Sequence, residues 1–282
     1  WPDTRITVNL APTHVRKVGS GLDLAIAMAL LGASKQLNPE ALKGLMFLGE
    51  LGLNGTLRPI LGILPLVDSL SAGRVVVPAE NLAEARLVRP DARGVRTLSE
   101  LVSALRAEEP WPDPPVREST SSPADAYCDL AEVQGHPVAR RALEVAATGG
   151  HHVLMVGPPG SGKTMLAERL PGLLADLDAR GAMDVSRVHS AAGLLRVHNG
   201  LLTRPPFRSP HHTASLVALI GGGSTLLRPG EVSLASGGVL FLDELGEFPA
   251  AHLDALRQPL ESGIIRVARA NANVTLPARF IL

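Results

Sequence analysis

The sequence has a single cysteine and few aromatic residues. Cys128 has no second cysteine to pair with, which excludes an internal disulfide framework and fits a reducing compartment. Phe, Trp and Tyr make up only 3% of the chain, although hydrophobic residues make up 45%. This composition argues against an aromatic-rich β fold and favours aliphatic α/β packing. We therefore expect a cytoplasmic α/β protein.

The sequence also lacks an excess of either charge and any long apolar run. Lys and Arg number 27, as do Asp and Glu, so any nucleic-acid contact has to come from locally placed basic side chains. The apolar residues 22–31 end at Gly32, which is too short a run for a membrane helix, and no signal peptide is recognisable. Strand-like patterns, Arg5–Leu10 and Arg279–Leu282, lie at both ends, so we expect a part of a longer protein.

A proline- and serine-rich stretch divides the chain, whose 282 residues are more than one domain usually needs. Residues 110–124 contain five prolines and are predicted to be a linker, because such a stretch cannot hold a helix or a central strand. Residues 1–109 alternate strand and helix patterns and are predicted to form a small α/β domain. In this domain Asn81 is expected to cap a helix over residues 82–88. Residues 125–282 form the second predicted domain.

A phosphate-binding loop lies near the start of the second domain. Residues 157–164 match the pattern G-x-x-x-x-G-K-[ST] at every fixed position. The glycines let backbone N–H groups turn toward phosphate oxygens, the lysine reaches the β- and γ-phosphates, and the hydroxyl binds Mg²⁺. The apolar run Val153–Val156 before the loop is predicted to be a buried parallel strand. The residues expected to contact ATP here are Gly157, Pro158, Pro159, Gly160, Ser161, Gly162, Lys163, Thr164 and Met165.

A second apolar stretch ends in two acidic residues. Residues 238–242 are predicted to be a strand, and Asp243 follows 80 positions after Lys163 (243 − 163), with Glu244 next. Side chains at the carboxyl ends of parallel strands lie where α/β sheets bind ligands. We expect Asp243 to hold Mg²⁺ together with Thr164, and Glu244 to orient and deprotonate the attacking water. The alternative is an ordinary strand end with solvated acids.

An Asp-Glu pair in place of a lone Asp suggests the AAA+ class of P-loop ATPases. In that class the stretch Val133–His136, ahead of the phosphate loop, would pack on adenine, with Val133 and Gly135 as its contacts. The alternative for this stretch is a plain capping turn before the helix predicted over residues 137–148.

Several further motifs resemble those of one family. Residues 207–215, Phe-Arg-Ser-Pro-His-His-Thr-Ala-Ser, resemble the ComM/YifB family of magnesium-chelatase-like bacterial AAA+ ATPases. The resemblance covers nearly the whole chain. The other stretches that carry it are residues 5–12, 221–223 with 229–231, 237–248, 260–263 and 277–280.

The resemblance implies a Lon-protease-type domain at residues 1–109, followed by an AAA+ module of the helix-2-insert group. It also implies hexameric rings and ATP-driven movement on DNA, namely branch migration during recombination of incoming DNA, with ATP and Mg²⁺ as cofactors. After Phe280–Leu282 the family places a sensor residue, the arginine finger and a helical lid, so we expect this stretch alone to be nearly inactive as an ATPase. Two alternatives stay open: a metal-insertion motor like magnesium chelatase, against which the Lon-like domain argues, and a non-hydrolysing ATP-binding scaffold.

The Lon-like domain raises a further possibility, a Ser-Lys peptidase. Lon proteases carry the nucleophile in a K-D-G-P-S-A-G pattern and the lysine after a P-I-G-G-L pattern. Here Gly21 and Leu64 hold those two positions, and Ser20 lies one residue too early. A hydroxyl cannot be activated by an adjacent base in that register, so no peptidase activity is expected. His14, Lys17 and Ser20 are interpreted as a solvated polar loop.

Two adjacent histidine pairs invite a metal interpretation, His151–His152 and His211–His212. Neighbouring side chains seldom point the same way, and no further ligands lie at the spacing of a metal site. For Arg208, His211 and His212 the sequence leaves two roles open, in loops that face the ring channel or in a subunit interface.

The candidate DNA contact lies in residues 264–277. Two alternating apolar segments flank a turn-forming stretch, which predicts a β-hairpin. In the helix-2-insert group this hairpin projects into the channel, where Arg266 and Arg269 could meet phosphates. The alternative is a solvated or interface hairpin.

Overall fold

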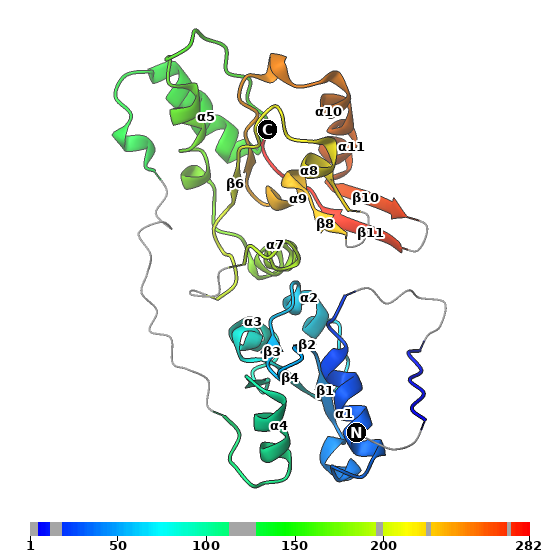
Figure 1. The fold of residues 1–282 in the computed structure, drawn as a ribbon. Helices are drawn as coiled ribbons and strands as arrows, with labels where there is room; N and C mark the ends of the chain where they lie inside the picture. Colours follow the sequence, from blue (N-terminus) through cyan, green and yellow to red (C-terminus); the bar gives the residue numbers. More distant parts are fainter. Residues whose placement is uncertain (1–4, 12–18, 113–127, 196–199, 224–226, 270–271) are drawn as a thin grey trace. The chain divides into compact units, whose positions relative to one another are not determined.

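The chain forms two compact units, residues 1–119 and 120–282, each of mixed α/β structure as the sequence predicts (Figure 1). The structure is a computed structural model that describes residues 5–11, 19–112, 128–195, 200–223, 227–269 and 272–282. Most of the predicted linker lies outside these described ranges. No helix within them is long and apolar enough to span a bilayer.

The first unit is built on a three-stranded parallel sheet in the order β1-β4-β5, with a separate β2-β3 hairpin. Its helices are α1 (Asp23–Ala33), α2 (Ile63–Asp68), α3 (Leu82–Arg86) and α4 (Leu98–Leu105). Its strands are β1 (Leu45–Phe47), β2 (Glu50–Leu51), β3 (Leu57–Arg58), β4 (Arg74–Pro78) and β5 (Arg93–Val95).

The central strand β4 divides the core of this unit into two layers. Val76 packs with the side chains of α1 and α4, while Val75 and Val77 pack with those of α2 and α3. Successive strand residues point to opposite faces of the sheet, so a run of valines buried on both faces is the expected pattern for a central parallel strand.

Two predictions for this unit are wrong. Residues 5–10 form no strand and are largely exposed. Asn81 precedes α3, but its side chain makes no capping hydrogen bond. The buried Asn81 amide instead accepts from the Ile60 N–H (2.9 Å) and donates to the Ile60 carbonyl (3.1 Å), so a tertiary contact has taken the place of the local one.

Leu64 and Ser20, which the comparison with the Lon pattern singled out, lie in different surroundings. Leu64 is fully buried in the apolar core. The Ser20 hydroxyl donates to the carboxylate of Glu50, and this hydrogen bond lowers the pKa of Glu50 below its usual value. Ser20 is thus paired with an acid.

The second unit holds the predicted phosphate loop and acid pair. Its helices are α5 (Pro137–Gly149), α6 (Lys163–Ala167), α7 (Ala179–Ala191), α8 (Leu216–Ile220), α9 (Glu231–Leu234), α10 (Ala250–Ala255) and α11 (Arg257–Ser262). Its strands are β6 (Phe207–Arg208), β7 (Gly221–Gly222), β8 (Arg228–Pro229), β9 (Val239–Leu240), β10 (Ile264–Arg269) and β11 (Ala272–Pro277).

Strand β9 lies between two parallel neighbours. It pairs with β6 on one side and bridges to Ile281 on the other. The two side chains of β9 point to opposite faces. Val239 packs in a cluster with α5 and α6, and Leu240 packs in a cluster with α8, α9 and β10. The sheet therefore has an apolar layer on each face, which fixes where the chain after β9 emerges.

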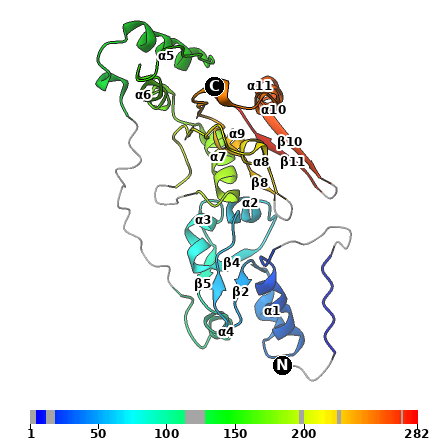
Figure 2. The ribbon, with the colours of Figure 1, turned by 45° about the horizontal axis from the view of Figure 1, so that its top comes forward.

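The predicted hairpin over residues 264–277 is present. β10 and β11 pair antiparallel from Ile264 opposite Pro277 to Arg269 opposite Ala272. Ile265 anchors the hairpin in the core, and the paired strands extend beyond α10 and α11 in both ribbon views (Figure 1 and Figure 2).

The segment Val153–Val156 is not the buried strand that was predicted. The Val153 N–H donates to the Leu282 carbonyl (2.8 Å), but Leu154 is 76% exposed and Val156 is 90% exposed. Among the described residues, 153–156 form no strand, and Leu282 also lies outside any strand. An apolar run is buried only when neighbours cover it, and that depends on more than its own residues.

An ion pair joins two of the family-like motifs. Arg208 on β6 donates from Nε (2.5 Å) and Nη2 (2.7 Å) to the two carboxylate oxygens of Glu231 on α9. The side chains are 30% and 22% exposed. A bidentate, largely covered pair of this kind stabilises more than a surface pair does.

We predict that Arg208→Ala destabilises the chain by about 1–3 kcal/mol, because it leaves the half-buried Glu231 carboxylate without its partner. The free energy of unfolding is measured by urea titration. Arg141→Ala removes an exposed pair with Glu144 on α5 and should cost less than about 0.5 kcal/mol. Equal effects of the two substitutions would show that the pair with Glu231 contributes no more than a surface contact.

Candidate functional site

The phosphate loop has the backbone that its motif requires. Residues 157–161 form an irregular loop, and Gly162 is the N-cap of α6. Gly160 and Gly162 have φ values of +77° and +82°, a left-handed conformation that strains residues with side chains. At Gly162 a Cβ atom would also lie 3.1 Å from the Met165 side chain. Glycine at these two positions therefore follows from the conformation of the loop.

The ammonium group of Lys163 lies beside the phosphate loop. Its Nζ donates to the carbonyl oxygens of Gly157 (2.9 Å) and Pro158 (3.1 Å). Both acceptors belong to the loop, so the ammonium group lies where an anion bound by the loop would meet it.

Thr164 and Asp243 are in contact although 79 positions separate them. The Thr164 hydroxyl donates to Oδ2 of Asp243 (3.0 Å), and the other carboxylate oxygen, Oδ1, accepts from the Glu244 N–H (2.9 Å). A hydroxyl and a carboxylate are hard oxygen ligands of the kind that Mg²⁺ takes. The pair therefore fits the cation that the motif implies.

Glu244 has an unusual backbone conformation. Its φ of 53° and ψ of 51° are left-handed, which costs a residue with a side chain about 1–2 kcal/mol. The carboxylate points into solvent, with the side chain 68% exposed, and its Oε2 lies 3.7 Å from Nδ1 of His212. Strain of this kind collects at functional sites, where it orients a side chain.

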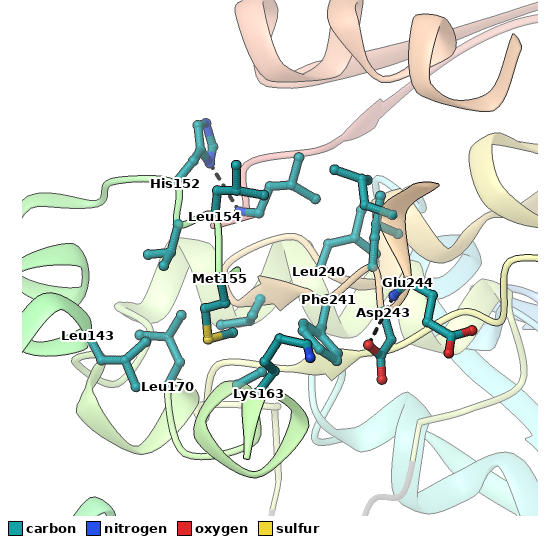
Figure 3. A pocket seen from close by; sticks show the side chains of 16 residues that line it. Leu143, His152, Leu154, Met155, Lys163, Leu170, Leu240, Phe241, Asp243 and Glu244 are labelled. Carbon is teal, nitrogen blue, oxygen red and sulfur yellow. Dashed lines mark hydrogen bonds between the residues drawn. The ribbon is translucent and has the colours of Figure 1, made fainter. Parts of the chain in front are cut away.

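A cavity of about 380 Å³ lies beside these residues. Its wall is mostly apolar, with side chains such as Leu143, Leu170 and Leu240, and Lys163, Asp243 and Glu244 supply polar groups (Figure 3). A mostly apolar hollow with a few converging polar groups is the usual form of a small-molecule site.

The predicted adenine-side residues lie close to the loop. Val133 is buried in the same apolar cluster that Met165 packs against, and Gly135 has a φ of +79°. Nε2 of His136 lies 3.9 Å from the position of a Cβ atom on Gly162. Arg169, two residues after the end of α6, holds the turn just before Val133. It donates to the Asp129 carbonyl (3.1 Å) and pairs with Glu132 (3.2 Å). Sequence reasoning missed Arg169, which belongs to no motif.

The remaining candidates divide into two groups. His212 lies beside Glu244, whereas Arg208 pairs with Glu231 away from the acids. Arg266 is exposed on β10; the side chain of Arg269 lies outside the described structure. Across the described ranges no group of three or more His, Cys, Asp or Glu side chains could hold a metal ion.

Comparison with known proteins identifies relatives of the whole chain. A family model described as "Magnesium chelatase, subunit ChlI" matches residues 129–282, and a second, "Subunit ChlI of Mg-chelatase", matches residues 1–81. The uncharacterized protein Rv2897c of Mycobacterium tuberculosis is 49% identical over 288 residues. The competence protein ComM of Haemophilus influenzae is 45% identical over 289 residues, and the uncharacterized protein YifB of Escherichia coli is 42% identical over 289 residues.

Each of these alignments covers 100% of this chain and 56% of the relative, so the chain spans little more than half the length of the curated relatives it matches. A cryo-EM-based complex of subunits BchI and BchD of magnesium chelatase is also similar, with a TM-score of 0.40 and 24% identity over 51% of this chain and 50% of that chain. That score is too low to add to the assignment. The family match over more than half of the residues is sufficient, and the chain belongs to the magnesium chelatase subunit ChlI family of AAA+ proteins, in its ComM/YifB group.

Proposed function

We propose that the second unit binds ATP with Mg²⁺ and carries the hydrolytic residues of an AAA+ motor that acts on DNA. The observation that carries the proposal is the hydrogen bond between Thr164 and Asp243, which brings the end of the phosphate loop to the acid pair. The two residues are 79 positions apart in the chain, and the atoms in contact are oxygens of the kind that bind Mg²⁺. Polar residues without a shared role would not be expected to meet in this way.

The residues divide the work as follows. Backbone N–H groups of residues 157–164 and the ammonium of Lys163 bind and orient the phosphates. The oxygens of Thr164 and Asp243 hold the cation. The carboxylate of Glu244 orients a water molecule and accepts its proton at one oxygen. Val133, Gly135 and Met165 line the adenine side. ATP, when bound, supplies the phosphoanhydride bond whose hydrolysis drives movement.

We propose DNA as the substrate on which the motor acts, with hexameric rings and branch migration during recombination as its setting. The similarity to ComM, which is a competence protein, supports this proposal. So does the projecting β10-β11 hairpin with its exposed Arg266. Because the chain has no net charge, one copy offers little attraction to DNA, whereas a ring presents several copies of Arg266 and Arg269 to one polymer.

A metal-insertion motor is the second candidate, and the names of both matching family models favour it. The second model, which is named for a magnesium chelatase subunit, matches residues 1–81. This match weakens the argument that the N-terminal domain speaks against a chelatase. We keep the proposal that residues 1–109 are a Lon-type domain without the Ser-Lys dyad. A non-hydrolysing scaffold is disfavoured, because Lys163, Asp243 and Glu244 are all present.

In the full-length protein, Glu244→Gln should abolish ATP hydrolysis and leave ATP binding intact, because the amide cannot accept a proton from water. Lys163→Ala should instead weaken ATP binding at least tenfold, since it removes a charge-assisted contact of about 1.5–3 kcal/mol. Phosphate release and titration calorimetry measure the two effects. Glu247→Gln, an exposed acid three positions away, is the matched control. Normal turnover by the Glu244 variant would place the base elsewhere.

Arg269→Ala in the full-length protein should reduce affinity for forked DNA and make its salt dependence shallower, because fewer counterions are released. ATP affinity should not change. Fluorescence anisotropy at several salt concentrations gives the slope, and Arg141→Ala on α5 is the control. An unchanged slope would count against the hairpin contact. ATPase activity that branched DNA fails to stimulate would favour the metal-insertion alternative.

A further inference from the structure

The strand register brings the histidine motif to the acid pair. β6 and β9 run parallel with Arg208 opposite Leu240. His212 and Glu244 each follow four residues later, at the same edge of the sheet. The family-like motif at residues 207–215 therefore ends beside the proposed base, a proximity that the spacing along the chain does not reveal.

The imidazole of His212 is held in place on two sides. Its ring lies 4.1 Å from that of His211 and meets the edge of the Phe248 ring at 6.4 Å and 80°. Its side chain is 29% exposed, against 68% for Glu244. His212 is thus the better-fixed partner, and Glu244 is the side chain that can turn.

The neighbouring histidine does not compete for the carboxylate. Nδ1 of His211 accepts from the hydroxyl (2.8 Å) and the N–H (3.3 Å) of Thr213, which directs it back to its own loop. His252 on α10 donates from Nε2 to the Ala214 carbonyl (3.1 Å) and anchors the same loop. Among these three histidines, His212 is the one whose Nδ1 lies near Glu244.

We propose that His212 is a positioning residue for Glu244: its Nδ1–H donates to the carboxylate and holds it in the orientation that accepts a proton from water. The separation of 3.7 Å closes to hydrogen-bond length by a small rotation of the exposed Glu244 side chain, and such contacts commonly tighten when a site is filled. This inference rests on the proposed role of Glu244 in hydrolysis.

The kinetic test uses the full-length protein. His212→Ala should lower kcat for ATP by about ten- to a hundredfold, the size expected when a reacting group is misplaced. KM and the affinity for ATP should stay the same, since His212 touches neither the loop nor the cation ligands. His212→Asn keeps an N–H donor near the position of Nδ1 and should restore most of the rate. His151→Ala, an exposed histidine elsewhere in the unit, is the matched control.

A ligand-free measurement tests the contact itself. Imidazole ¹⁵N shifts of this chain, recorded near pH 8 where ordinary imidazoles are neutral, report which ring nitrogen carries the proton. Wild type should show His212 protonated at Nδ1, and Glu244→Ala should shift it toward protonation at Nε2. An Nδ1 proton unaffected by Glu244→Ala would overturn the proposal.

The two ideas fail in different ways. A His212→Ala protein with normal kcat, alongside an inactive Glu244→Gln protein, would overturn the role of His212 and leave the ATPase proposal standing. Normal turnover by Glu244→Gln would instead overturn the role of Glu244 as the base, even where the nitrogen shifts of His212 still respond to Glu244→Ala.

Discussion

The parallel pairing of β9 on both of its edges is the constraint on which the site depends. The Phe241 N–H donates to the Arg208 carbonyl and the Leu240 N–H to the Ile281 carbonyl, both within 2.9 Å. Strands this closely held fix the point where Asp243 and Glu244 leave the sheet. The approach is so tight at Gly238 that a Cβ atom there would lie 2.0 Å from the Pro206 carbonyl oxygen. The glycine before the acidic motif is therefore required by the packing of the strands.

Features that depend on local backbone chemistry could be predicted from the sequence. The phosphate loop needs glycine at specific conformations, and the β10-β11 hairpin needs alternating strands around a turn, so both can be recognised from their own residues. Features set by distant partners could not. Val156 is exposed because burial depends on neighbouring strands, and Asn81 bonds to Ile60 where a local cap was expected. Lys163, Thr164, Asp243 and Glu244 belong to recognisable motifs, whereas Arg169, which contacts Asp129 and Glu132, belongs to none.

The contact between His212 and Glu244 shows what the motif pattern leaves out. The sequence indicated that residues 207–215 were distinctive and left open a channel or interface role. The register between β6 and β9 brings the motif to the acid pair, because the two strands advance in step from Arg208 and Leu240. The bidentate pair of Arg208 with Glu231 links the same strand to α9. In the motif at residues 207–215, Arg208 thus stabilises the fold, and His212 lies beside the proposed base.

The central claim is that Thr164 and Asp243 hold the cation of a bound Mg²⁺–ATP complex. The most direct measurement is the affinity of this chain for ATP by titration calorimetry, with Mg²⁺ and with a chelator, in wild type and in Asp243→Asn. The account predicts that Mg²⁺ tightens binding to wild type by about tenfold or more, as expected for a charge-assisted contact, and that this gain is largely lost in the variant. The same gain from Mg²⁺ in both proteins would contradict it.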